Sequence, residues 1–217
     1  MESIRTLGRR LIHLAAVVAL VASAPSAWAE PAAEQLADTL KSYRTYQASF
    51  IQILVNESGG QVQETRGELK AKRPGLFYWS THSPMSQFIV SDGEEVTLYD
   101  PDLEQVTIHK LDQRASSTPA LLLSGEVDNL AETYDISHRA LGNETEEFTL
   151  TPRNPDSLFV SLKLSFVDGE LQEMRMRDSL AQLSILSFDS IRLNQDLADS
   201  AFELDYPESV DVIQDAP

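Results

Sequence analysis

Residues 158–166 read Leu-Phe-Val-Ser-Leu-Lys-Leu-Ser-Phe, and this stretch decides the fold class. Apolar side chains recur at every second position from Leu158 to Phe166, and the positions between them hold Phe159, Ser161, Lys163 and Ser165. Successive side chains of a strand point to opposite faces, so the alternation predicts a β-strand with one covered and one solvated face. This pattern is typical of antiparallel sheets, because buried parallel strands have continuous apolar runs.

Similar β-rich runs fill most of the chain, separated by turn signals such as Ser58-Gly59-Gly60 and Ser91-Asp92-Gly93. We expect strands at 48–55, 61–72, 75–82, 86–90, 94–99, 103–110, 133–141, 146–152, 158–166, 170–177, 182–193 and 202–206. So many consecutive strands with short turns predict a large antiparallel meander or barrel-like sheet.

Two segments break this pattern and predict helices. In residues 32–46, Leu36, Leu40 and Tyr43 recur at helical spacing. In residues 117–132, Thr118 is a candidate N-cap and Gly125 a candidate helix end. Both segments are expected to pack on the apolar face of the sheet.

The N-terminal residues 1–29 predict a secretory signal peptide. Three arginines precede the nine-residue apolar run Leu14–Ala22, and Ala27-Trp28-Ala29 offers small residues two apart for cleavage. The run is far shorter than the ~20 residues that span a bilayer. We therefore expect cleavage after Ala29 and one domain at residues 30–217.

Composition excludes several classes of protein. The 217 residues include 17 basic and 34 acidic side chains, a net charge of −17, and no cysteine. Without cysteine there is no disulfide scaffold, thiolate metal site or thiol nucleophile. The acidic excess argues against nucleic acid as a partner, because phosphate contacts need Lys and Arg.

No catalytic motif is found in the sequence. His82, His109 and His138 lie in separate predicted strands or turns, and no two are at metal-ligand spacing. No phosphate-binding glycine loop or nucleophile motif occurs either. We expect no enzymatic activity, no metal and no cofactor, although a carboxylate pair of a hydrolase assembled only by the fold is an alternative.

Large apolar side chains are spread over many of the predicted strands. One helix and one short insertion cannot fill the inner face of so wide a sheet, so it closes on its own side chains or leaves an apolar cavity. Such a cavity suits an apolar ligand. The candidate lining is Phe50, Phe77, Trp79, Phe88, Leu98, Phe148, Met174 and Met176, with Leu121 and Leu122 of the central insertion. Any one of them could equally be plain core.

Several motifs, in order along the chain, resemble those of the LolA family, the periplasmic outer-membrane lipoprotein carrier proteins. They include Tyr46-Gln47-Ala48-Ser49-Phe50-x-Gln52, Lys72-Arg73-Pro74-Gly75-Leu76-Phe77-Tyr78-Trp79, Ile89-Val90-Ser91-Asp92-Gly93, Thr118-Pro119-Ala120-Leu121-Leu122-Leu123 and Asp178-Ser179-Leu180-Ala181-Gln182. Ala181 departs from the family pattern, which has glycine there.

The resemblance implies an unclosed antiparallel β-barrel of about 11 strands, capped by an N-terminal helix and a central helical insertion that form a lid. It implies that Arg73 latches this lid by bonding carbonyls at the positions of Leu40, Leu123 and Ser124. A guanidinium offers five donors and stays charged, so it can hold several carbonyls at once. Phe77 and Trp79 match aromatic residues on the cavity side.

The implied ligands are lipoprotein acyl chains. The implied partners are the inner-membrane lipoprotein-releasing ABC transporter and the outer-membrane lipoprotein receptor, and the implied carrier is a monomer of the periplasm. Two alternatives stay open. The same half-barrel could serve a sensor or regulator. It could also carry another lipid or glycolipid, because an apolar wall does not distinguish the acyl chains of different lipids.

Overall fold

The computed structural model describes residues 31–111 and 119–214, and most of these lie in strands. The strands are β1 (Thr45–Val55), β2 (Gln61–Lys72), β3 (Leu76–Ser83), β4 (Gln87–Asp92), β5 (Glu95–Asp100), β6 (Gln105–Lys110), β7 (Tyr134–Gly142), β8 (Thr145–Pro152), β9 (Phe159–Val167), β10 (Glu170–Asp178), β11 (Leu183–Leu193) and β12 (Asp211–Gln214). The mainly β fold class is therefore confirmed. The predicted signal peptide at 1–29 and the predicted cap at Thr118 lie outside the described residues.

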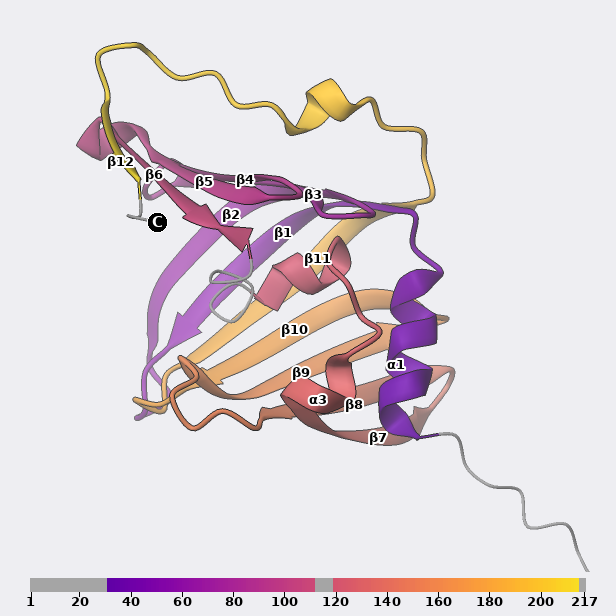
Figure 1. Cartoon of the computed structure of the whole chain (residues 1–217). Helices are drawn as coiled ribbons and strands as arrows, with labels where there is room; N and C mark the ends of the chain where they lie inside the picture. The colour runs from indigo at the N-terminus through magenta and orange to yellow at the C-terminus, as the bar shows by residue number, and fades with distance from the viewer. Residues whose placement is uncertain (1–30, 112–118, 215–217) are drawn as a thin grey trace, which may run out of the picture.

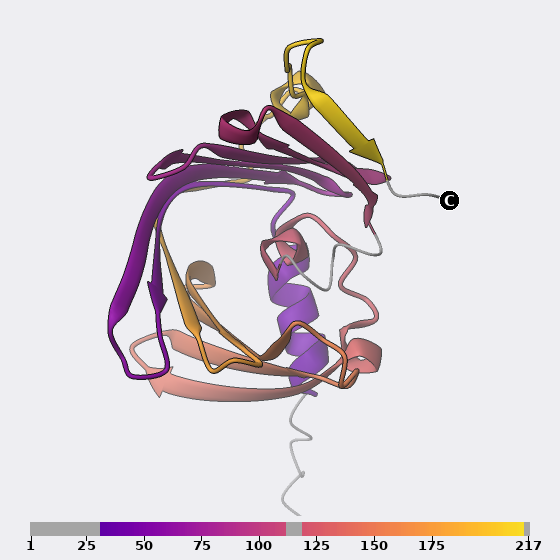
Figure 2. The same cartoon turned by 90° about the vertical axis from the view of Figure 1, so that its left-hand side faces the viewer.

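All strands belong to one sheet that does not close. Its order is β12-β6-β5-β4-β3-β2-β1-β11-β10-β9-β8-β7, and only the β12–β6 pair is parallel. The sheet is a meander, except that β1 pairs with β11 on its other side. Figure 2 shows it as a C-shaped wall with one open side. The predicted unclosed antiparallel β-barrel is confirmed, with 12 strands in place of about 11.

Helical segments cover the open side of this wall. Helix α1 (Ala32–Lys41) runs across one end of the sheet and buries Leu36, Ala37 and Leu40 (Figure 1). The 3-10 helix η2 (Pro119–Leu123) and the short helix α3 (Leu130–Thr133) lie in the opening. We call residues 119–133 the lid segment. The helix predicted at 32–46 is shorter in the structure, because β1 already begins at Thr45.

The core lies between the inner face of the sheet and these helices. Leu36 and Leu40 of α1 and Leu121 and Leu123 of the lid segment join one cluster with inward side chains of the strands. Alternate residues of β1, namely Tyr46, Ala48 and Phe50, face this core. The inner face of the sheet is therefore packed against the helical segments that cover its open side.

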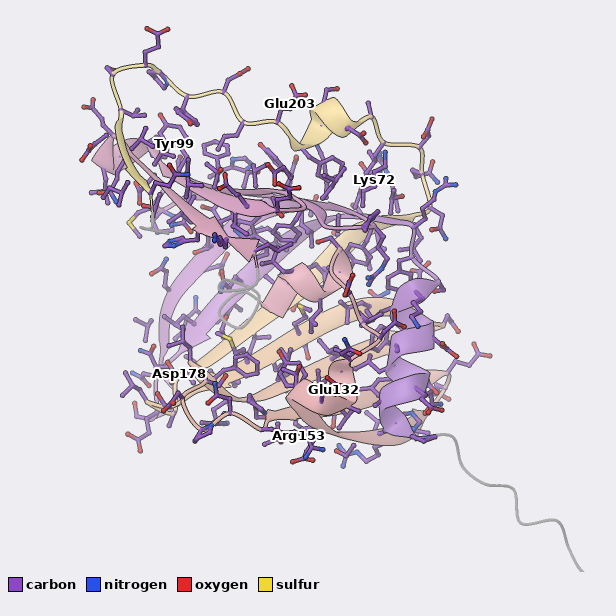
Figure 3. The ribbon with its side chains drawn as sticks, viewed as in Figure 1. Lys72, Tyr99, Glu132, Arg153, Asp178 and Glu203 are labelled. Atoms are coloured by element: carbon purple, nitrogen blue, oxygen red, sulfur yellow. The ribbon has the colours of Figure 1, made fainter. Side chains whose placement is uncertain are left out.

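The C-terminal segment covers part of the outer face. The 3-10 helix η3 (Asp199–Phe202) contacts β3 and β4, and β12 then pairs with the edge strand β6. Figure 3 shows this segment, with Glu203, passing over the strands on the side of Tyr99. The strand predicted at 202–206 is wrong, since these residues are a 3-10 end and extended chain, and β12 was not predicted.

The alternation of residues 158–166 is interrupted once. Phe159 pairs with Asp178 but Ser161 pairs with Arg177, so one extra residue of β9 stands at Val160. This irregularity moves Phe159 to the buried face and leaves Leu158 and Val160 exposed. The prediction that Leu158 and Val160 share the face of Leu162 to Phe166 is therefore wrong.

Candidate functional site

Arg73 joins the two helical parts that cover the open side. It follows β2 directly, where Arg73 N–H donates to the Arg44 carbonyl. Its Nε donates to the Leu40 carbonyl of α1 at 3.2 Å, and its Nη2 donates to the Leu122 carbonyl at 2.9 Å. Its Nη1 donates to the Gly125 carbonyl. One guanidinium thus bonds the end of α1 and two carbonyls of the lid segment.

The carbonyl partners differ from the expected set in the lid segment. Leu40 accepts as expected, but Leu122 and Gly125 accept in place of Leu123 and Ser124. The Ser124 carbonyl instead accepts from Gly75 N–H at 2.7 Å. The physical reason is that alternate carbonyls of this tight turn point in different directions. Arg73 and Gly75 therefore hold neighbouring carbonyls of one turn.

Charge around this contact also ties α1 to the lid segment. Lys41, the last residue of α1, forms an ion pair with Asp128. The hydrogen bond that the Lys41 ammonium donates to the Asp128 carboxylate raises the pKa of Lys41. Burial lowers the pKa of Arg73, and the nearby Asp128 carboxylate acts in the opposite direction. Asp128 is thus a counter-charge for both cations. Its role was not predicted, because nothing in the local pattern distinguishes it from other acidic residues of polar turns.

Most candidate lining residues gather on the inner face. Phe50 and Trp79 stack with ring centroids 3.9 Å apart. Leu122 and Met176 are partly buried against the same core. Leu98 shares its face with Trp79, since both are linked to Ile89 through cross-strand pairing. The buried members of the set are Phe50, Phe77, Trp79, Leu121, Phe148 and Met174.

Phe88 lies on the other face of the sheet. Its ring stacks on Tyr99 at 6.0 Å between centroids, and Tyr99 in turn contacts Tyr206 of the C-terminal segment. Phe88 is the neighbour of Ile89, which faces the core, so the alternation of β4 sends it outward. The assignment of Phe88 to the cavity is therefore wrong. An apolar outer position was not foreseen because the cover by the C-terminal segment was not predicted.

A cavity of about 1030 Å³ lies at the opening of the wall, beside the lid segment. Its lining combines Leu121 and Leu122 with the Gly75 region, the β4–β5 turn and Tyr134 at the start of β7. Carboxylates of Glu94 and Glu126 are part of the lining. The inner aromatic residues Phe50 and Trp79 are not part of this lining, and they belong to the buried cluster that also holds Leu121 and Leu123.

The described residues offer no arrangement for metal chemistry. Within 31–111 and 119–214, no three His, Asp or Glu side chains lie close enough together to hold an ion. In the same ranges, no helix is long and apolar enough to cross a membrane.

Comparison with known proteins gives consistent matches over most of the chain. The family model described as outer membrane lipoprotein carrier protein LolA matches residues 41–205. The outer-membrane lipoprotein carrier protein of Hahella chejuensis is 46% identical over 210 residues, covering 96% of this chain and 100% of that one. The protein of the same name from Pseudomonas fluorescens is 44% identical over 207 residues, covering 95% and 100%.

A solved structure is similar in fold only. An uncharacterized conserved protein from Thermus thermophilus superposes with a TM-score of 0.51 at 15% identity, covering 84% of this chain and 97% of that one. The overall fold is thus shared with that protein.

Proposed function

Because the chain belongs to the family of outer-membrane lipoprotein carrier proteins, we propose that it binds the acyl chains of lipoproteins and carries them through the periplasm to the outer membrane. The observation that carries this proposal is the bridge from Arg73 to both α1 and the lid segment, above an apolar inner face. The role requires binding and release, and no chemical step.

We infer that the hydrogen-bonded arrangement of Arg73 with α1 and the lid segment is the closed state of the lid. Leu121 and Leu123 belong to the same buried cluster as Phe50 and Trp79, and we infer that acyl chains would replace them there. Each CH₂ buried from water contributes about 0.8 kcal/mol, so an empty open interior would be costly. Cargo would instead exchange one set of apolar contacts for another. The net free energy of binding is then small enough for cargo to leave again.

Arg73 sets the balance between the closed and the open lid. Hydrogen bonds from a charged group contribute about 1.5–3 kcal/mol each, and Arg73 makes bonds to Leu40, Leu122 and Gly125. These bonds favour the closed, empty carrier and break when cargo enters. A cargo that binds only the open state has its apparent affinity lowered by the population of that state. The latch thereby promotes release.

The proposed route has a donor and an acceptor. We infer that the carrier receives its cargo from the inner-membrane lipoprotein-releasing ABC transporter and delivers it to the outer-membrane lipoprotein receptor. The carrier acts as a monomer, since its apolar inner face is covered by its own lid. The acidic excess of the chain gives no role to nucleic acid.

Co-purification tests the nature of the cargo. The protein is isolated from the periplasm under mild conditions, and the bound material is identified by mass spectrometry. A lipoprotein with its acyl chains is the expected result. A free glycolipid as the main ligand would support a carrier or sensor of another lipid and would contradict the proposed function.

A further inference from the structure

The inner face of the sheet changes from apolar to polar side chains along the strands. At the end near α1 it is apolar, with Tyr46, Ala48 and Phe50 of β1 in the core. Further along β1, the next inward position is Gln52. Neighbouring strands place Gln63, Thr65 and Ser184 on the same face, and we call these four residues the inner polar cluster.

Hydrogen bonds and strand pairing hold the inner polar cluster together. Gln52 pairs across the strands with Thr65, and its Nε2 donates to Ser184 Oγ at 2.8 Å. Gln63 Nε2 donates to Thr65 Oγ1 at 3.2 Å. Thr65 and Ser184 are buried, with 9% and 8% exposure. None of these four side chains is ionisable, so the cluster is a neutral polar zone within an apolar wall.

The cluster lies near the end of the wall that is away from α1. Val55 pairs with Leu183, so the turns after β1 and before β11 are at this end, as is Asp178 (Figure 3). At ~3.4 Å per residue, the inward path from Gln52 back to Tyr46 is roughly 20 Å long. Half of the ~30 Å hydrocarbon core of a bilayer, about 15 Å, is the length that an acyl chain spans. The path is therefore long enough to hold an acyl chain whose linkage lies at the inner polar cluster.

The polar side chains of the cluster match the ester or amide linkage that joins an acyl chain to its head. Ester and amide linkages present neutral carbonyl oxygens, which accept hydrogen bonds. A glutamine amide has two N–H donors, so Gln52 and Gln63 each keep one beyond the bond described. Hydroxyl groups of Thr65 and Ser184 can rotate to donate. A neutral donor set avoids the cost of burying an unpaired charge.

We propose that the inner polar cluster is a subsite for the ester and amide carbonyls that link acyl chains to their head. It would fix how deep the chains enter and would distinguish acylated cargo from plain hydrocarbon. The inference rests on the proposed function, since it assumes acyl chains along the inner face. It adds a recognition of the linkage, which an apolar wall alone cannot provide.

The test compares two synthetic lipopeptides of equal chain length, one with ester linkages and one with ether linkages. Ethers lack the carbonyl oxygen but keep the hydrocarbon. Neutral hydrogen bonds change affinity by roughly 2- to 10-fold each, so the wild-type protein should bind the diester roughly tenfold more tightly. Gln52→Leu and Thr65→Val should each reduce this preference.

Gln47→Leu is the matched control, because Gln47 lies on β1 but on the other face. It should keep the full preference for the diester. Ser184→Ala is a smaller change that serves if Gln52→Leu does not fold. The subsite is contradicted if wild-type protein binds both lipopeptides equally, or if the variants keep the preference. If wild-type protein binds neither lipopeptide, the proposed function itself fails.

Discussion

The ring of Phe50 stacks on the indole of Trp79 across the intervening strand β2, with planes inclined by 27°. The β2 residue between them is Gly67, which pairs with Phe50. A Cβ at this position would overlap the Ser80 carbonyl oxygen and lie 2.5 Å from Phe50 Cζ. The missing side chain of Gly67 is therefore what allows the two rings to meet on the inner face.

Gly67→Ala should destabilise the protein. The added methyl group meets backbone as well as the Phe50 ring, and overpacking of this kind costs about 1–3 kcal/mol. Urea unfolding followed by tryptophan fluorescence measures the change. Gly60→Ala is the control, because its Cβ would have no neighbour closer than 3.4 Å. Equal stability of the two variants would show that the stacking does not depend on Gly67.

Ala181→Gly should stabilise the protein. Ala181 has φ of +60° in the turn between β10 and β11, the conformation that glycine adopts without a steric penalty. A left-handed conformation costs an L-residue about 1–2 kcal/mol, and the greater freedom of glycine when unfolded offsets part of this. We expect a gain of about 0.5–1 kcal/mol in the free energy of unfolding.

Ala140→Gly provides the opposite control. Ala140 is exposed in β7, where glycine weakens a strand by roughly 0.5–1 kcal/mol. Thermal and urea unfolding of both variants would give changes of opposite sign. A loss of stability in Ala181→Gly would mean that the turn does not strain Ala181.

Alkaline pH should unfold the protein partly through its buried tyrosines. Tyr43 and Tyr46 are almost fully buried, and burial raises the pKa of both above the ordinary value near 10. Tyr46 O–H also donates to the Leu171 carbonyl at 2.7 Å. Above pH 10 the unfolded chain releases these protons while the folded chain keeps them. Stability therefore falls by about 1.4 kcal/mol per pH unit for each tyrosine.

Tyr46→Phe tests this assignment. At neutral pH the variant loses one buried hydrogen bond, which costs about 1 kcal/mol. Between pH 10 and 11.5 its stability should fall less steeply than that of the wild type, because one titrating group is gone. Unfolding free energies measured over this range give the two slopes. Identical slopes would show that Tyr46 does not keep its proton in the folded state.

Local patterns were sufficient to predict most strands, since alternation and turn residues depend on nearby sequence. They failed where the chain departs from regular pairing. The extra residue at Val160 reverses the face of Phe159, and no turn residue marks it. Phe88 was wrongly placed on the inner face, because it stacks on Tyr99, which contacts Tyr206 far along the chain.

The site was predictable in its residue types but not in its contacts. Arg73 was identified through resemblance, yet its partner carbonyls depend on how a turn of the lid segment is oriented. Leu122 and Gly125 accept because their carbonyls point to the guanidinium, while that of Ser124 points to Gly75. Backbone direction in a tight turn is decided by tertiary packing, which residue identity does not encode.

Cargo hand-off by Arg73 variants tests the account most directly. A fluorescent lipopeptide is loaded on wild-type, Arg73→Lys and Arg73→Leu protein, and its transfer to the purified receptor is followed over time. Without the three carbonyl contacts the population of the open state rises. Arg73→Leu should therefore fold, bind the lipopeptide roughly tenfold more tightly and transfer it more slowly. Arg73→Lys keeps the charge but lacks the branched guanidinium, so its affinity and its transfer rate should be intermediate. Transfer by Arg73→Leu at the wild-type rate, with unchanged affinity, would contradict the latch.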